Sequence, residues 1–150
     1  MRRIFFLGSL LTLLSAWELC AQAYNDVPLE TDRMIVSTAC YVKWNIRDLN
    51  GDGSVNCIDY ACMFKRTWDK RYPQHKDECA IVRNKNGSFH HLFIQVKFGR
   101  NNFVLVEPWV TDPERYKMED NWSKRYNPRY NIYGETNRWL RECGQGYAPW

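Results

Sequence analysis

The feature that most constrains the fold is a twelve-residue stretch, 48–59, in which side chains with oxygen atoms recur at fixed spacing. They stand at positions 1, 3, 5, 9 and 12 of the stretch, and Gly53 stands at position 6, where such a loop turns sharply. Apolar residues at helical spacing begin at its end. The sequence therefore predicts an ordered loop that leads into a helix, with Val55 at position 8 anchoring the loop to the core.

This spacing predicts a calcium site, because Ca²⁺ binds about six to eight oxygen ligands and EF-hand-type loops supply them at these positions. The backbone carbonyl of Ser54 would fill position 7. The alternative is a surface turn rich in Asn and Asp that binds no metal. Calcium in such a loop would stabilise a small domain rather than take part in chemistry. The predicted calcium ligands are Asp48, Asn50, Asp52, Ser54, Asn56 and Asp59.

The N-terminal residues have the pattern of a targeting segment. A basic start precedes the apolar run 4–14, and residues 21–23 read Ala-Gln-Ala, the small-x-small pattern that precedes signal-peptidase cleavage. We therefore expect a signal peptide over 1–23 and one domain over 24–150, in a secreted or periplasmic protein. The apolar run is too short for a bilayer, so no membrane span is expected.

The charge of the chain argues against binding to nucleic acid. The formal net charge is +4, from 21 basic and 17 acidic residues, and the basic residues form no stripe along the sequence. A nucleic-acid-binding surface is usually marked by such a stripe. A solvated surface of mixed charge, with no nucleic acid partner, is the expectation.

Cysteine usage raises the question of which thiol stays reduced. Export would permit disulfides, and five cysteines follow the predicted signal peptide, so at least one is left over. We expect that thiol to be Cys57, with Cys62–Cys79 and Cys40–Cys143 as the disulfides, although four cysteines allow three pairings. The alternative is that Cys57 is itself half of a structural disulfide.

The apolar periodicity predicts an α+β fold. It changes from helical spacing to alternation near residue 79, so a helix should pack on a small antiparallel meander. The tail from Val110 is polar but rich in aromatic residues, which would either cover the core or line a substrate groove. The expected helices and strands span 28–43, 57–70, 79–83, 89–98 and 103–109.

Cys57 is a candidate nucleophile because it begins the predicted helix, where the helix dipole favours a thiolate. A reactive thiolate needs a histidine to carry protons and a third group to orient that histidine. Among three histidines, His90 and His91 lie on the long predicted strand, and Glu107 lies on the strand that returns beside it.

Strand geometry decides which histidine can meet Glu107, because neighbouring side chains point to opposite faces. An odd-length turn over 99–102 would place His91 on the face of Glu107, and an even-length turn would place His90 there. His90 also shares a face with the apolar residues Leu92 and Ile94, which suits a core histidine. We choose His91 and keep His90 as the alternative.

Three segments resemble bacterial transglutaminase-like cysteine proteases. Asn56-Cys57-Ile58-Asp59-Tyr60-Ala61 resembles the nucleophile motif, His91-Leu92-Phe93-Ile94-Gln95-Val96 the histidine strand, and Val104-Leu105-Val106-Glu107-Pro108 the acid strand. The resemblance implies a papain/transglutaminase-like fold. The resemblance implies that Cys57 is the nucleophile, His91 the general base and Glu107 the orienting acid. The family usually has Asp at the position of Glu107. The substrate would be a protein or peptide, and the reaction amide hydrolysis or acyl transfer.

The loop 48–59 resembles the calcium loop of dockerin repeats. A dockerin module has two such repeats and this chain has one, so no cohesin partner is expected. The alternative to an enzyme is a secreted binding protein that is stabilised by calcium and disulfides, with the aromatic tail as its contact surface.

Overall fold

The computed structural model describes residues 27–83, 91–109 and 132–145, and they form the predicted α+β arrangement. The predicted signal peptide, His90 and most of the aromatic tail lie outside the described residues. In chain order the elements are α2 (Leu29–Asn45), α3 (Cys57–Arg71), the 3₁₀ helix η1 (Pro73–Glu78), β1 (Cys79–Arg83), β2 (Leu92–Phe98), β3 (Asn102–Val106) and α5 (Ile132–Gln145).

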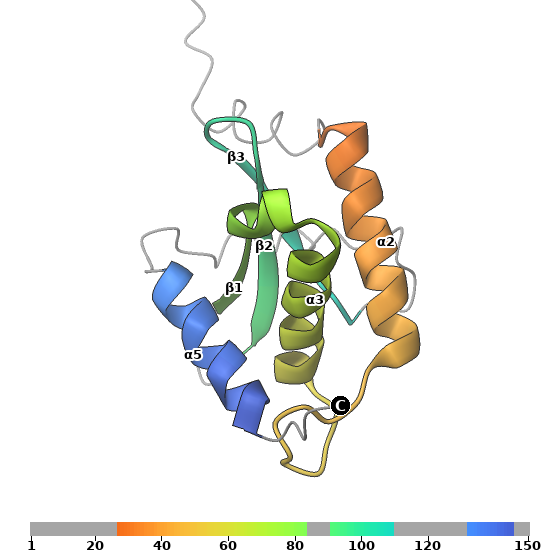
Figure 1. Cartoon of the computed structure of the whole chain (residues 1–150), viewed down its shortest axis with the longest axis vertical. Helices are drawn as coiled ribbons and strands as arrows, with labels where there is room; N and C mark the ends of the chain where they lie inside the picture. The colour runs from red at the N-terminus through yellow and green to blue at the C-terminus, as the bar shows by residue number, and fades with distance from the viewer. Residues whose placement is uncertain (1–26, 84–90, 110–131, 146–150) are drawn as a thin grey trace, which may run out of the picture.

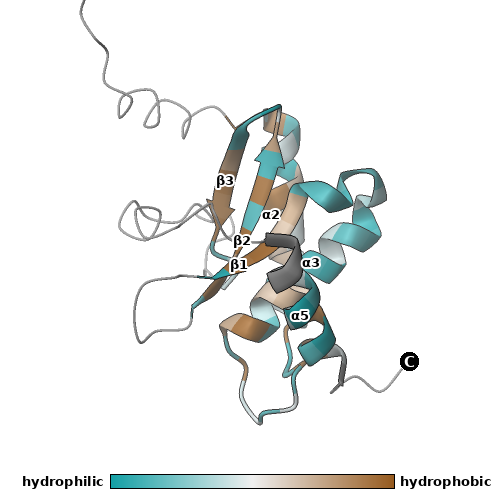
Figure 2. Ribbon diagram, turned by 90° about the vertical axis from the view of Figure 1, so that its left-hand side faces the viewer, coloured by the Kyte–Doolittle hydropathy of each residue, from teal (hydrophilic) through white to brown (hydrophobic). Residues whose placement is uncertain are grey.

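The three strands form an antiparallel sheet in the order β1-β2-β3. Ile94 at the centre of β2 pairs with Ile81 on one side and with Val106 on the other. Phe98 pairs with Asn102, so three residues turn the chain from β2 to β3, and Gly99 there has a positive φ of 62°. Figure 2 shows apolar colour along β3 and hydrophilic colour at this turn.

The helices lie on one face of the sheet. In Figure 1, α2 lies on one side of α3 and α5 on the other, with β1 and β2 visible between α5 and α3. The core between α3 and the sheet includes Phe64, Trp68 and Ile94, none of which is exposed. The opposite face of the sheet carries a smaller apolar cluster around Phe93. In the described part of the chain, no helix has both the length and the apolar character needed to cross a bilayer.

Helix α5 and its disulfide correct two expectations. The sequence predicted no helix after residue 109, yet α5 packs along β1, where the hydroxyl of Thr136 accepts from the Ile81 amide at 2.9 Å. It also brings Cys143 to Cys62 on α3, and these two form a disulfide. Both predicted disulfides are therefore wrong, because the position of Cys143 depends on a helix that was not anticipated.

The anchor of the loop before α3 also differs from the prediction. Val55 was expected to hold the loop to the core, but its side chain is 47% exposed. Leu49, one residue after the loop begins, is 1% exposed and packs in the main core instead. The loop is therefore fixed at its start by apolar packing.

Candidate active site at the start of α3

The start of α3 is fixed by a capping box. The Asn56 side chain accepts from the Ile58 amide at 2.9 Å, and the Asp59 carboxylate accepts from the Asn56 amide at 2.9 Å. These two bonds satisfy amides that a helix N-terminus leaves without partners. Cys57 is therefore held as the first residue of the helix, where the helix dipole favours negative charge.

Asp59 also ties the loop to the helix. Its carboxylate is fully buried, and its Oδ1 accepts from the Leu49 amide at 2.6 Å and from the Asn50 amide at 3.3 Å. Backbone groups from both ends of the loop thus meet on one buried carboxylate. The Asp59 carboxylate, which belongs to α3, therefore holds the two ends of the loop together.

The turn between β2 and β3 selects His91. Its three residues, 99–101, are an odd number, so His91 and Glu107 lie on the same side of the sheet, as the odd-length case predicted. Nε2 of His91 lies 2.5 Å from Oε2 of Glu107. Both side chains are largely buried, at 11% and 13% exposure. The pair is therefore mostly shielded from solvent.

Cys57 completes a chain of three groups. Its sulfur is hydrogen-bonded to the His91 side chain and to the backbone amide of Leu92. Since Nε2 of His91 is engaged with Glu107, the bond to Cys57 falls to Nδ1. The structure thus brings together all three residues that the sequence singled out for catalysis, and Cys57 is a thiol.

These contacts shift the ionisation of all three groups. Burial raises the pKa of Cys57, but the hydrogen bonds from His91 and the Leu92 amide outweigh it, and the net pKa is lowered. Burial lowers the pKa of His91, but the bonds to Cys57 and Glu107 reverse this and raise the pKa to about 9. Burial raises the pKa of Glu107, against the opposing effect of His91. The first two shifts favour a thiolate–imidazolium pair.

Comparison with family models, curated proteins and solved structures gives no match to this chain. The geometry of this site and the residue types that it brings together therefore indicate its chemistry.

One contributor to the site was missed in the sequence. The ring of Trp109 lies 5.5 Å from that of His91, and its side chain also interacts with the Glu107 carboxyl. Trp109 is 52% exposed, so it covers the histidine from the solvent side. The available signal was its position two residues after Glu107, which places the two side chains on the same face of an extended chain.

The loop before α3 gathers the other predicted site residues. Asp48 accepts from the amides of Gly51 at 2.7 Å and Gly53 at 2.8 Å, and both glycines have positive φ, 74° and 88°. The amide groups of Asn50 and Asn56 both donate to Oδ2 of Asp52 at 2.9 Å. Side chains from positions 3, 5 and 9 therefore converge on one point, as a cation cage requires.

This loop fits calcium in part. The Asn50 oxygen accepts from the Asp52 amide at 3.1 Å and the Asn56 oxygen from the Ile58 amide at 2.9 Å, so the N–H₂ groups, not the oxygens, point at Asp52. Asp59, the expected ligand at position 12, is instead buried and bonded to three backbone amides. In the described residues no three His, Cys, Asp or Glu side chains cluster to hold a metal, so calcium here would need Asn and Ser oxygens in addition to Asp48 and Asp52.

Proposed function

We propose that the protein is a cysteine protease or acyltransferase of the papain/transglutaminase type that acts on amide bonds of a protein or peptide. One observation carries this proposal: a single histidine bonds both a thiol at a helix N-terminus and a buried carboxylate. Nucleophile, proton carrier and orienting group need this order of contacts. A secreted or periplasmic location, expected from residues 1–23, belongs to the same proposal.

The reaction would begin with the Cys57 thiolate attacking the carbonyl carbon of the amide. A carbon–sulfur bond forms, and the carbonyl electrons move to the oxygen. As that intermediate collapses, the carbon–nitrogen bond breaks and the imidazolium of His91 gives its proton to the leaving amine. Glu107 orients the ring and stabilises its positive charge. The Ile58 amide is engaged by Asn56 and is therefore not available to stabilise the oxyanion.

The thioester would then pass its acyl group to water or to an amine. His91 takes a proton from the incoming group as the new bond to carbon forms, and Cys57 leaves as a thiolate. Water gives hydrolysis and an amine gives transfer, so both reactions use the same three residues.

We also propose that the loop binds calcium through Asp48, Asn50, Asp52, Ser54 and Asn56. The support is the convergence of positions 3, 5 and 9, together with the turn at Gly53. Asp59 would act as the buried link between the loop and α3. A bound ion would add fixed positive charge close to Cys57.

The test of the enzyme proposal is selective alkylation followed by an activity assay. We expect iodoacetamide at pH 6 to modify Cys57 first, as found by mass spectrometry of the non-reduced protein, and His91→Ala to slow that step. Labelled peptides incubated with and without an amine should then give hydrolysis or transfer that Cys57→Ser abolishes. Cys40→Ser is the matched control, because Cys40 is another partly buried thiol.

The alternative is a binding protein without catalysis. The observation that favours it is Trp44 on α2, whose side chain is 80% exposed and offers a contact surface. In that case Cys57 and Cys40 would be alkylated at similar rates, and no labelled peptide would be cleaved or joined to an amine. That pair of results would refute the enzyme proposal.

A further inference from the structure

Asn50 and Gly51 form a dipeptide with a chemistry of its own, inside the loop before α3. The side-chain carbonyl of an asparagine can be attacked by the backbone nitrogen of the next residue, and glycine hinders that attack least because it has no Cβ. Gly51 is exposed, and a Cβ built on it would meet no heavy atom within 4 Å apart from its chain neighbours. The peptide bond between the two residues is therefore open to water.

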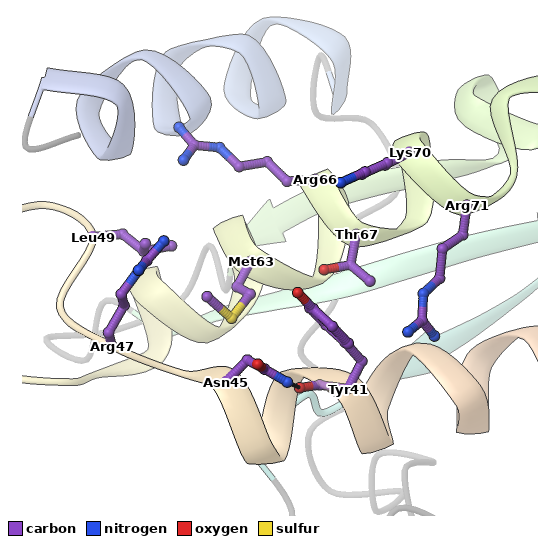
Figure 3. A pocket seen from close by; sticks show the side chains of 9 residues that line it. All are labelled: Tyr41, Asn45, Arg47, Leu49, Met63, Arg66, Thr67, Lys70 and Arg71. Carbon is purple, nitrogen blue, oxygen red and sulfur yellow. Dashed lines mark hydrogen bonds between the residues drawn. The ribbon is translucent and has the colours of Figure 1, made fainter. Parts of the chain in front are cut away.

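The chain before this peptide bond is fixed in place. Leu49 is 1% exposed and packs in the main core, and Figure 3 shows its side chain in the space between α3 and the segment that follows α2. The Asn50 amide donates to the buried carboxylate of Asp59 at 3.3 Å. Asn50 therefore approaches Gly51 from one fixed direction, and a reaction between fixed groups costs less entropy than one between mobile groups.

The Gly51 nitrogen, which would attack, has its hydrogen held by a carboxylate. Its N–H donates to Oδ1 of Asp48 at 2.7 Å. An N–H points along the plane of the peptide group, so the two faces of the nitrogen stay open. A charged acceptor also draws the hydrogen away from the nitrogen. The contact therefore prepares the nitrogen for attack rather than blocking it.

The Asn50 side chain, which would be attacked, is folded back along the loop. Its oxygen accepts from the Asp52 amide at 3.1 Å, a bond that turns the side chain towards its own main chain. Attack on a carbonyl carbon moves negative charge to the oxygen, and an amide already bonded there stabilises that charge. The attacking nitrogen, the carbonyl carbon and the stabilising amide thus all come from one ordered turn.

We propose that Asn50 is a modification site that loses ammonia spontaneously. The Gly51 nitrogen bonds to the side-chain carbonyl carbon of Asn50, and its proton passes through solvent to the amide nitrogen, which leaves as ammonia. The product is a cyclic imide. Water opens this ring at either carbonyl, which gives aspartate or isoaspartate at position 50. These steps consume only water and need no contribution from Cys57.

The two products would change the proposed calcium site, and this step rests on that proposal. Aspartate at position 50 adds a carboxylate to those of Asp48 and Asp52, and the affinity of calcium loops depends on the number of charged ligands. Isoaspartate puts an extra methylene into the main chain between Asp48 and Gly51, so the hydrogen bond between these two residues would be lost. The first product should strengthen calcium binding, and the second should weaken it.

Peptide mapping by mass spectrometry tests the modification. The full chain is incubated in EDTA at mildly alkaline pH, either folded or in urea, and sampled over several weeks. We expect Asn50 to convert in the folded protein at least as fast as in urea, while Asn45 and Asn56, which precede bulkier residues, stay unchanged. Slower conversion of Asn50 in the folded protein than in urea would overturn the proposal.

Matched glycine variants test the role of the peptide bond. Gly51→Ala adds a methyl group beside the attacking nitrogen and should slow conversion of Asn50 by about tenfold or more. Gly53→Ala is the control, because Gly53 also has a positive φ and open space around it, and it should slow conversion much less. Cys57→Ser should convert at the wild-type rate. Equal slowing in both alanine variants, or loss of conversion in Cys57→Ser, would contradict spontaneous attack by the Gly51 nitrogen.

Calcium titration of Asn50→Asp, by isothermal calorimetry, tests the consequence for the loop. We expect its Kd to be about tenfold lower than that of the wild type. Asn101→Asp adds the same charge at the exposed turn between β2 and β3, and should leave the Kd unchanged. Equal Kd values for Asn50→Asp and the wild type would refute the effect of deamidation on calcium. Absence of calcium binding in all three proteins would instead refute the calcium site, and the mass spectrometry would still decide the modification.

Discussion

At the scale of single residues, His91 is the group on which the candidate active site depends. One ring nitrogen contacts a buried carboxylate, and the other is left for a thiol at the first residue of α3. The contact with Glu107 would not arise if the turn between β2 and β3 had an even number of residues. The site is thus a consequence of strand register as much as of residue type.

The shifted ionisation of Cys57 predicts the pH dependence of its alkylation. With its pKa lowered, the Cys57 thiol should form its thiolate at a lower pH than an ordinary thiol, so the alkylation rate should rise at a lower pH in the wild type than in His91→Ala. Hydrolysis also needs protonated His91 and should fall as pH passes about 9. Stopped-flow measurement of the alkylation rate in EDTA, over a range of pH, tests the prediction for Cys57. A rate that rises only near pH 9 in the wild type, as expected for His91→Ala, would refute this prediction.

Two substitutions of Glu107 should separate the effect of the carboxylate's position on catalysis from the effect of its charge. Glu107→Asp keeps the carboxylate but withdraws it from His91 by about one carbon–carbon bond, roughly 1.5 Å. Glu107→Gln keeps the length and removes the charge that stabilises the imidazolium. We expect the first to lower kcat by about tenfold and the second by about a hundredfold. The Gln variant should also move the alkaline limb of the pH profile to lower pH, and an unmoved limb would contradict the role of Glu107.

The sequence identified Cys57, His91 and Glu107 because chemistry restricts the residue types and alternation restricts their faces. It favoured His91 and kept His90 as the alternative, since the choice depends on the length of a turn that only the strand pairing sets. Trp109 was missed because an aromatic residue near the end of a strand is as readily a core residue as a cover for a histidine.

At the scale of elements, the loop and α3 behave as one unit joined by Asp59. The carboxylate accepts from amides at residues 49, 50 and 56, and no part of the residue is exposed. The sequence predicted a metal ligand at this position. A buried carboxylate that closes a loop and caps a helix has the same sequence pattern, so only the structure separates the two roles.

Asp59→Asn tests this link. An amide in place of the carboxylate would aim an N–H₂ group at backbone donors and leave at least one buried amide unsatisfied, so we expect a loss of about 3 kcal/mol in the free energy of unfolding. Asp52→Asn is the matched control, because Asp52 is exposed in the same loop, and it should change stability little. Urea titrations in EDTA measure both. Equal, small effects would show that Asp59 is not the link.

Element boundaries were predicted well for α3 and the first strand, and α5 was missed altogether. The helix expected over 57–70 ends one residue later, and the first strand begins and ends where it was expected. α5 was missed although its residues have a stronger amphipathic pattern than those of α2 or α3, because the whole tail was interpreted as an aromatic cover or groove rather than tested for helical spacing. That single omission also made both predicted disulfides wrong, since Cys143 had no predicted place in the fold.

At the scale of the whole molecule, the Cys62–Cys143 disulfide joins α5 to the helix that carries Cys57. It spans 81 residues of sequence, and closing a loop of that length restricts the unfolded chain strongly. We expect the double variant Cys62→Ala and Cys143→Ala to lose about 4 kcal/mol in the free energy of unfolding, measured by urea titration. Cys40→Ala, which removes a thiol outside any disulfide, should lose much less. A similar loss in both would contradict a stabilising role for the bridge.

Calcium would join the loop, the start of α3 and the stability of the whole domain. An ion that binds only the folded chain stabilises it by about 2.7 kcal/mol when its concentration is a hundred times its Kd. We therefore expect calcium to raise the thermal midpoint of the wild type but not of Asp48→Asn or Asp52→Asn, each of which removes one charged ligand. Because the Asp59 link carries the loop position to Cys57, calcium should also speed alkylation of Cys57 at pH 6, and EDTA should reverse this. A midpoint that rises equally in the wild type and both variants would show that calcium acts elsewhere on the protein. A midpoint that rises only in the wild type, with no change in alkylation, would confine the ion to a structural role.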